Sequence, residues 1–171
     1  MKTKKLTVLA LSVALAMILS FIESQIPSFV PIPGVKIGLA NIVVVFALYK
    51  LGWKEAAGIS LLRVFLVSVL FGHAASFFYS MAGALLSFCG MVLLKRTGLF
   101  SHIAVSVAGG VLHNVGQILM ACILLETNII TYYLPILILS GTLAGIVIGL
   151  LASVMVSRIR LDLEPDEKGK S

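Results

Sequence analysis

The chain has 171 residues, of which 60% are hydrophobic and only 12% are charged. A soluble domain is closer to half apolar and a quarter charged, so this composition excludes an ordinary water-soluble fold and indicates an integral membrane protein. The formal net charge of +6 does not indicate nucleic-acid binding, because the basic residues lie mostly in short breaks between apolar runs. In such breaks, Lys and Arg orient membrane helices.

Six apolar runs follow one another along the chain, at residues 6–22, 35–49, 56–71, 77–94, 103–125 and 134–156. A helix needs ~20 residues to cross the hydrocarbon core, within a range of ~17–25. We therefore expect one all-α membrane domain of residues 1–160 with six transmembrane helices, followed by a charged cytoplasmic tail of residues 161–171. The second and third runs are short, and a count of five crossings follows if the second run re-enters the membrane instead of spanning it.

The basic residues predict the orientation of these helices. Lys and Arg occur before the first run, between the second and third, between the fourth and fifth, and after the sixth, whereas residues 72–76 and 126–133 contain neither. Because cytoplasmic loops carry an excess of Lys and Arg, both termini are expected in the cytoplasm. The basic start of the first run also resembles a signal peptide, but residues 21–24 offer no small-residue cleavage site, which favours a retained helix.

Arg63 stands near the middle of the third run. A central Arg costs ~2.5–3.5 kcal/mol on insertion scales, so it should face a partner, a water-filled cavity or a ligand. A structural ion pair with Glu23 and a contact to a bound ligand both account for its presence.

The fifth run carries three polar side chains on one helical face, His113, Asn114 and Gln117, with Gly110 on the same face. Interhelical hydrogen bonds would explain them, although such bonds contribute only ~0.6 kcal/mol each in a measured membrane protein. Three such groups beside a glycine favour the wall of a binding cavity, in which the glycine opens space beside the imidazole.

Further polar residues are expected at the outer ends of the first three helices. Together with Arg63 and the polar stripe they predict an outward-facing cavity for a small anionic or zwitterionic molecule, because guanidinium binds carboxylate and phosphate in a two-pronged manner. These outer residues are Glu23, Lys36, Asn41 and His73. The loop 23–36 contains three prolines and is therefore expected to be stiff.

Small residues recur at four-residue spacing in two helices. Gly141, Gly145 and Gly149 predict close helix packing inside the bundle, whereas Ala10 and Ala14 mark a flat strip on the first helix. Cys89 and Cys122 lie inside apolar runs without a metal-binding motif and are expected to be packing residues.

Motifs of enzymes are missing from the sequence. Asp occurs only at positions 162 and 166, and there is no phosphate-binding loop and no nucleophile elbow. We therefore expect no catalytic residues, no metal site and no cofactor, and an intramembrane enzyme is the least favoured class.

The stretch PGVKIGLANIVVVFALYKLG at residues 33–52, together with Arg63 and HNVGQ at residues 113–117, resembles the heptaprenyl diphosphate synthase component I family of bacterial cell-membrane proteins, also called the Gx transporter family. The likeness covers about residues 6–160. This family is similar in turn to the substrate-binding S components of energy-coupling factor transporters. The resemblance implies six helices, a lid formed by the loop after the first helix, and docking through Ala10 and Ala14 onto a transmembrane coupling subunit driven by two cytoplasmic ATPases.

The sequence is therefore consistent with two alternative functions. In the first, the chain captures a small nutrient or precursor. Arg63 makes the main charge contact, and the polar residues of the fifth helix recognise the ligand by hydrogen bonds. Lys36 and Asn41 would then close the mouth of the cavity. In the second, the chain is a non-catalytic membrane component in heptaprenyl diphosphate and menaquinone biosynthesis, and the polar stripe is buried and paired within the bundle.

Overall fold

The computed structural model describes residues 2–25, 38–72 and 74–161. These residues form six α-helices and one short 3-10 helix, with no β-strand among them. The elements are α1 (Lys2–Gln25), α2 (Asn41–Lys50), α3 (Trp53–Phe71), α4 (Ala74–Thr97), α5 (His102–Leu124), η1 (Ile129–Tyr133) and α6 (Leu134–Arg158). The expected all-α class is confirmed.

Four segments in the described part of the chain are long and apolar enough to cross a membrane. They lie in α1, α4 and α5 and in the continuous stretch from η1 to α6. The protein is therefore a multi-pass membrane protein. Helix α3 has 19 residues but carries Lys54, Glu55 and Arg63, so its length rather than its hydropathy supports a crossing.

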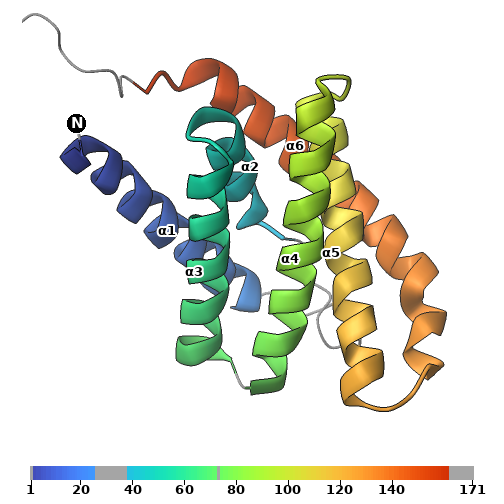
Figure 1. The fold of residues 1–171 in the computed structure, drawn as a ribbon. Coiled ribbons are helices and arrows are strands. Elements are labelled where there is room, and N and C mark those ends of the chain that lie inside the picture. The colour runs from blue at the N-terminus through green and yellow to red at the C-terminus, as the bar shows by residue number, and fades with distance from the viewer. Residues whose placement is uncertain (1, 26–37, 73, 162–171) are drawn as a thin grey trace, which may run out of the picture.

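The helices run between two ends of the bundle (Figure 1). One end holds the start of α1, the α2–α3 and α4–α5 connections and the end of α6. We call it the basic end, because Lys5, Lys54, Arg96 and Arg158 lie there. The opposite end holds the α3–α4 and α5–α6 connections. This alternation agrees with the basic and non-basic connections expected from the sequence.

Helix α2 is much shorter than a membrane-spanning helix. Its 10 residues correspond to ~15 Å, about half of the ~30 Å hydrocarbon core. The expected helix at residues 35–49 is thus observed only from Asn41, because the chain turns at residues 38–40, where Gly38 has a φ of 80°. Residues 35–37 lie outside the described part. Six full-length crossings remain a prediction.

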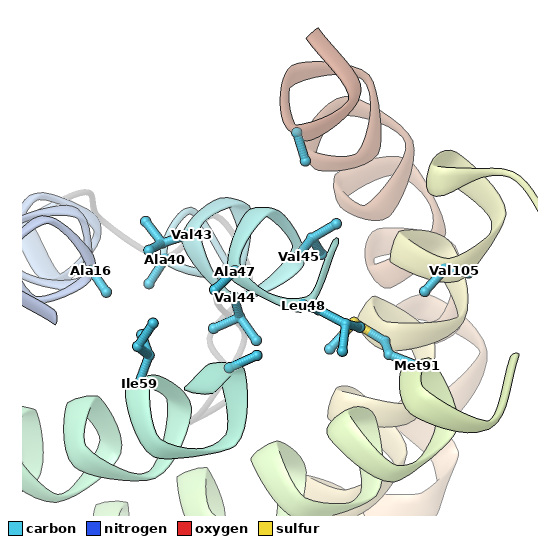
Figure 2. Close-up of a cluster of buried hydrophobic side chains, with 12 residues drawn as sticks. Ala16, Ala40, Val43, Val44, Val45, Ala47, Leu48, Ile59, Met91 and Val105 are labelled. Carbon is cyan, nitrogen blue, oxygen red and sulfur yellow. The ribbon is translucent and has the colours of Figure 1, made fainter. Parts of the chain in front are cut away.

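The hydrophobic core is built around α2 (Figure 2). Residues 43–48 of this helix are all buried, as expected for a helix that is apolar on every side. Ala16 of α1, Ile59 of α3, Met91 of α4 and Val105 of α5 belong to the same cluster. Ala152 of α6 belongs to it as well, so all five other α-helices contribute to the cluster around α2, and α2 does not depend on contact with lipid along its length.

Helix α5 packs closely against α6 through the glycines at four-residue spacing. A Cβ atom on Gly145 would lie 2.5 Å from the Cα atom of Val107, and one on Gly149 would lie 2.7 Å from the Cα atom of Ile103. The two backbones could not approach this closely with larger residues. The prediction of internal bundle packing is therefore confirmed. Cys89 and Cys122 are both free cysteines.

Candidate functional site

Three of the predicted site residues meet at one cavity, in the half of the bundle nearer the α3–α4 and α5–α6 connections. Glu23 of α1, Arg63 of α3 and His113 of α5 all line it, and its volume is about 70 Å³. We call it the Arg63 cavity. Arg63 is 9% exposed and Glu23 is 7% exposed, so both charged side chains are removed from the surface. Three helices that are distant in sequence thus bring charged and titratable groups together.

Glu23 links the charge of Arg63 to the start of α2. Its Oε1 atom accepts a hydrogen bond from the backbone N–H of Gly38, in the turn that precedes α2. Glu23 also interacts electrostatically with Arg63. The first backbone N–H groups of a helix have no partner within the helix, and its N-terminus attracts negative charge. The carboxylate therefore has a backbone N–H donor on one side and interacts with the cation of Arg63.

Arg63 retains an unused donor inside this arrangement. Its Nε atom is buried and has no hydrogen-bond partner in the described part of the chain. A buried donor without a partner costs ~1–3 kcal/mol, more for a charged group. The Glu23 interaction therefore leaves room for a further acceptor at Arg63. The electrostatic interaction with Glu23 agrees with the first sequence-based explanation of Arg63, whereas contact with a bound ligand stays a prediction.

Serine side chains form much of the remaining wall of the Arg63 cavity, and the sequence reasoning missed them. They come from three helices: Ser20 and Ser24 of α1, Ser68 of α3, and Ser76 and Ser80 of α4. A hydroxyl group both donates and accepts hydrogen bonds, so this wall suits a polar guest. The sequence does contain a signal for them: Ser20 and Ser24, and likewise Ser76 and Ser80, are four residues apart, which places each pair on one helical face.

The polar stripe of α5 does not form a single wall. His113 also borders a second cavity of about 20 Å³, together with Asn41, Asn114 and Gly110. Gln117 is 7% exposed and lines neither cavity; a Cβ atom on Gly83 of α4 would lie 3.0 Å from its Cγ atom. The stripe is therefore divided between two cavities and the α4–α5 contact.

Asn114 and Gly110 have structural partners in α6. The Nδ2 atom of Asn114 donates a 2.7 Å hydrogen bond to the carbonyl oxygen of Leu137, and Asn114 is 3% exposed. A Cβ atom on Gly110 would lie 2.5 Å from the carbonyl oxygen of Gly141. Gly110 thus permits close approach of α6, in addition to bordering the second cavity.

Lys36 and His73 lie outside the described residues.

Ala10 and Ala14 line a separate apolar groove between α1 and α3, with a volume of about 700 Å³. At the basic end of this groove, Lys5 of α1 and Glu55 of α3 form an ion pair with a 2.5 Å Nζ–Oε1 distance. The predicted docking strip on α1 is therefore accessible from outside the bundle. Whether a partner subunit binds there stays a prediction.

A model of the heptaprenyl diphosphate synthase component I family matches residues 12–155, which is most of the chain. The chain belongs to this family. No curated protein and no solved structure matches it.

Component I is the non-catalytic component of heptaprenyl diphosphate synthase. The described residues of this component I family member contain no group of three or more His, Cys, Asp or Glu side chains that could hold a metal ion. What they do contain is a buried cation beside a carboxylate, surrounded by hydroxyl groups. Such a set can bind and orient an anion by hydrogen bonds and charge.

Proposed function

We propose that this chain is a non-catalytic membrane component of heptaprenyl diphosphate synthesis, which associates with a soluble prenyl diphosphate synthase. The family match across residues 12–155 is the observation that carries this proposal. The basic end would lie in the cytoplasm, where Lys and Arg are favoured. A cytoplasmic synthase could then reach the α2–α3 and α4–α5 connections.

The basic end offers a surface that suits such an association. Leu99 is 85% exposed, and Phe100 and Trp53 are also exposed. The side chains of Lys54 and Arg96 lie over the Trp53 ring, with distances of 5.7 Å and 5.8 Å to its centroid. Protein interfaces favour aromatic residues and Arg, and flanking charges select the partner. We define Trp53, Lys54, Arg96, Leu99 and Phe100 as the basic-end patch.

Purification of the tagged chain from its native membrane in a mild detergent tests this proposal. The expected result is a soluble prenyl diphosphate synthase in the eluate, identified by mass spectrometry. An unrelated six-helix membrane protein with the same tag is the control for non-specific capture. An eluate with a coupling subunit and ATPases, and without a synthase, would contradict the proposal.

A second candidate function is a substrate-binding subunit of an energy-coupled transporter. The buried Arg63 side chain, with its unused Nε donor in the Arg63 cavity, supports this candidate. The cavity volume of about 70 Å³ is below the ~300–1,000 Å³ of typical small-molecule sites. A small anion fits this space better than a vitamin-sized molecule. In this alternative, Ala10 and Ala14 dock onto a coupling subunit that is driven by two ATPases.

Native mass spectrometry of the gently purified chain tests this second candidate. A retained small anion that is lost in Arg63→Ala, while the variant stays folded, would support it. The variant Arg158→Ala removes a similar charge at the exposed end of α6 and serves as the control. Equal retention by the wild type and folded Arg63→Ala would remove Arg63 as the ligand contact.

A further inference from the structure

The α1–α3 groove is lined mainly by aliphatic side chains. Leu9, Val13 and Met17 of α1 face Ile59 and Leu62 of α3 across it. The two helices diverge toward the basic end (Figure 1). The groove volume of about 700 Å³ compares with about 70 Å³ for the Arg63 cavity. It has room for a long hydrocarbon chain.

The length of the groove matches half a membrane. It extends along α1 from Leu6 to Met17, which corresponds to ~17 Å at 1.5 Å per residue. The hydrocarbon core is ~30 Å thick. A chain that entered at the basic end would therefore be held along about one leaflet and would continue into the bilayer beyond Met17.

Apolar contact alone cannot select the occupant of this groove. Inside a bilayer, lipid tails are as apolar as leucine, so hydrophobic burial gives no preference for one hydrocarbon over another. Selection must then come from the fit of the chain and from polar groups at the ends of the groove. The chemistry of the basic end decides which head group is favoured.

That end of the groove is positively charged. Lys54 and Glu55 line it, and Lys5 pairs with Glu55 across it. Lys5 and Lys54 are exposed, and together with Glu55 they leave a net charge of +1 at this end. A head group of several negative charges gains more from this site than a phosphodiester of one charge, because Coulomb attraction scales with the product of the charges.

We propose that the α1–α3 groove binds the hydrocarbon chain of a prenyl diphosphate, with the diphosphate at Lys5 and Lys54. This inference rests on the proposed function, because a partner synthase would release such a product at the same basic end. Glu55 competes with the diphosphate for Lys5. The groove would then receive the product as it leaves the soluble partner.

A steric variant tests the chain-binding part. A Cβ atom on Gly58, which lines the groove, meets nothing within 4 Å, so the side chain in Gly58→Leu starts from open space and adds bulk to the groove. Binding of heptaprenyl diphosphate to the full chain in lipid nanodiscs should weaken by about tenfold or more. Val69→Phe adds bulk at an exposed position of α3 outside the groove and should leave binding unchanged.

Charge variants test the head-group part. Lys5→Gln with Lys54→Gln should weaken binding of heptaprenyl diphosphate, and Glu55→Gln should strengthen it by removing the competing carboxylate. Lys50→Gln removes a charge at the end of α2, outside the groove, and is the control. Thermal unfolding of each variant identifies those that fail to fold, and Glu55→Gln provides a gain that misfolding cannot produce.

Three outcomes would overturn the inference. The first is equal displacement of the prenyl diphosphate by phosphatidylglycerol, which would make the groove a site for anionic lipids in general. The second is unchanged binding in folded Gly58→Leu. The third is a Gly58→Leu variant that loses only a co-purifying membrane protein, which would assign the groove to a partner helix. Co-purification of a soluble synthase with the wild type is measured separately, so failure of the groove and failure of the partnership are distinguishable.

Discussion

Glu23 and Arg63 line the same cavity from two different helices, and each is more than nine-tenths buried. The carboxylate of Glu23 also accepts a hydrogen bond from Gly38, at the turn before α2. One acidic side chain thus joins the end of α1, the start of α2 and the cation of α3. This junction holds a half-length helix in place and sets the charge of the Arg63 cavity.

Replacement of Glu23 should therefore be strongly destabilising. Glu23→Ala removes the acceptor for Gly38 and leaves Arg63 buried without its opposite charge, a change that typically costs about 3–5 kcal/mol. Chemical unfolding in detergent, followed by circular dichroism, would measure the loss. Glu126→Ala alters an exposed acid in the α5–α6 connection and should have little effect. Similar losses for the two variants would show that Glu23 has no special role.

A separate prediction concerns the interaction energy between Glu23 and Arg63 in the folded protein. If their charges balance each other, the double variant Glu23→Ala/Arg63→Ala should be more stable than the sum of the single losses predicts. Interaction energies of contacting or networked residues are about 0.5–3 kcal/mol. A double-mutant cycle of unfolding free energies gives this value. Strict additivity would mean that the two side chains share a cavity without influencing each other.

Asn114 should behave as a packing residue. Asn114→Leu removes its hydrogen bond to the Leu137 carbonyl, and such bonds in membranes contribute about 0.6 kcal/mol on average, with a maximum of ~1.7. We expect a loss of this size in the free energy of unfolding and no change in the binding of a small anion at the Arg63 cavity. Thr142→Val, which removes an exposed bond within α6, is the control. A lost ligand with unchanged stability would assign Asn114 to binding instead.

Glycine substitutions should separate the α5–α6 contact from the open face of α3. Gly145→Leu forces a side chain against the Val107 backbone, and overpacking of this kind costs about 1–3 kcal/mol or more. Gly58→Ala meets nothing within 4 Å and should be neutral or slightly stabilising, because alanine favours a helix more than glycine does. Melting temperatures in detergent would compare the two. A tolerated Gly145→Leu would refute the close packing of α5 and α6.

The basic-end patch should carry the association with the soluble partner. Leu99→Ser with Arg96→Glu replaces an exposed apolar side chain and reverses a charge beside Trp53. We expect the yield of co-purified synthase to fall while the melting temperature stays the same. Leu139→Ser, at an exposed position within α6, tests for an effect of lost hydrophobicity alone. An unchanged yield in the patch variant would exclude this surface.

The sequence predicts the helices well because long apolar runs in a membrane leave few alternatives to a helix. It does not predict the length of α2. Residues 35–49 are mostly apolar, but Gly38 has a positive φ, a turn follows it, and α2 begins at Asn41. Hydropathy reports where a segment is apolar and does not report where its backbone turns.

The site is predicted only in part. Arg63, Glu23 and His113 converge as expected, because a buried charge requires a polar neighbour. Asn114 finds its partner in a backbone carbonyl of α6, and every residue offers a carbonyl, so no sequence pattern marks that contact. The serines were missed because serine is common in membrane helices and only their convergence from three helices distinguishes them.

The membrane partnership is the central claim, and a sedimentation assay tests it most directly. The purified chain is reconstituted into liposomes, mixed with the soluble synthase of the same cell, and centrifuged. We predict that heptaprenyl diphosphate synthase activity sediments with liposomes that contain the wild-type chain, and does so much less with empty liposomes or with the patch variant. Activity that stays in the supernatant with all three preparations would contradict the account.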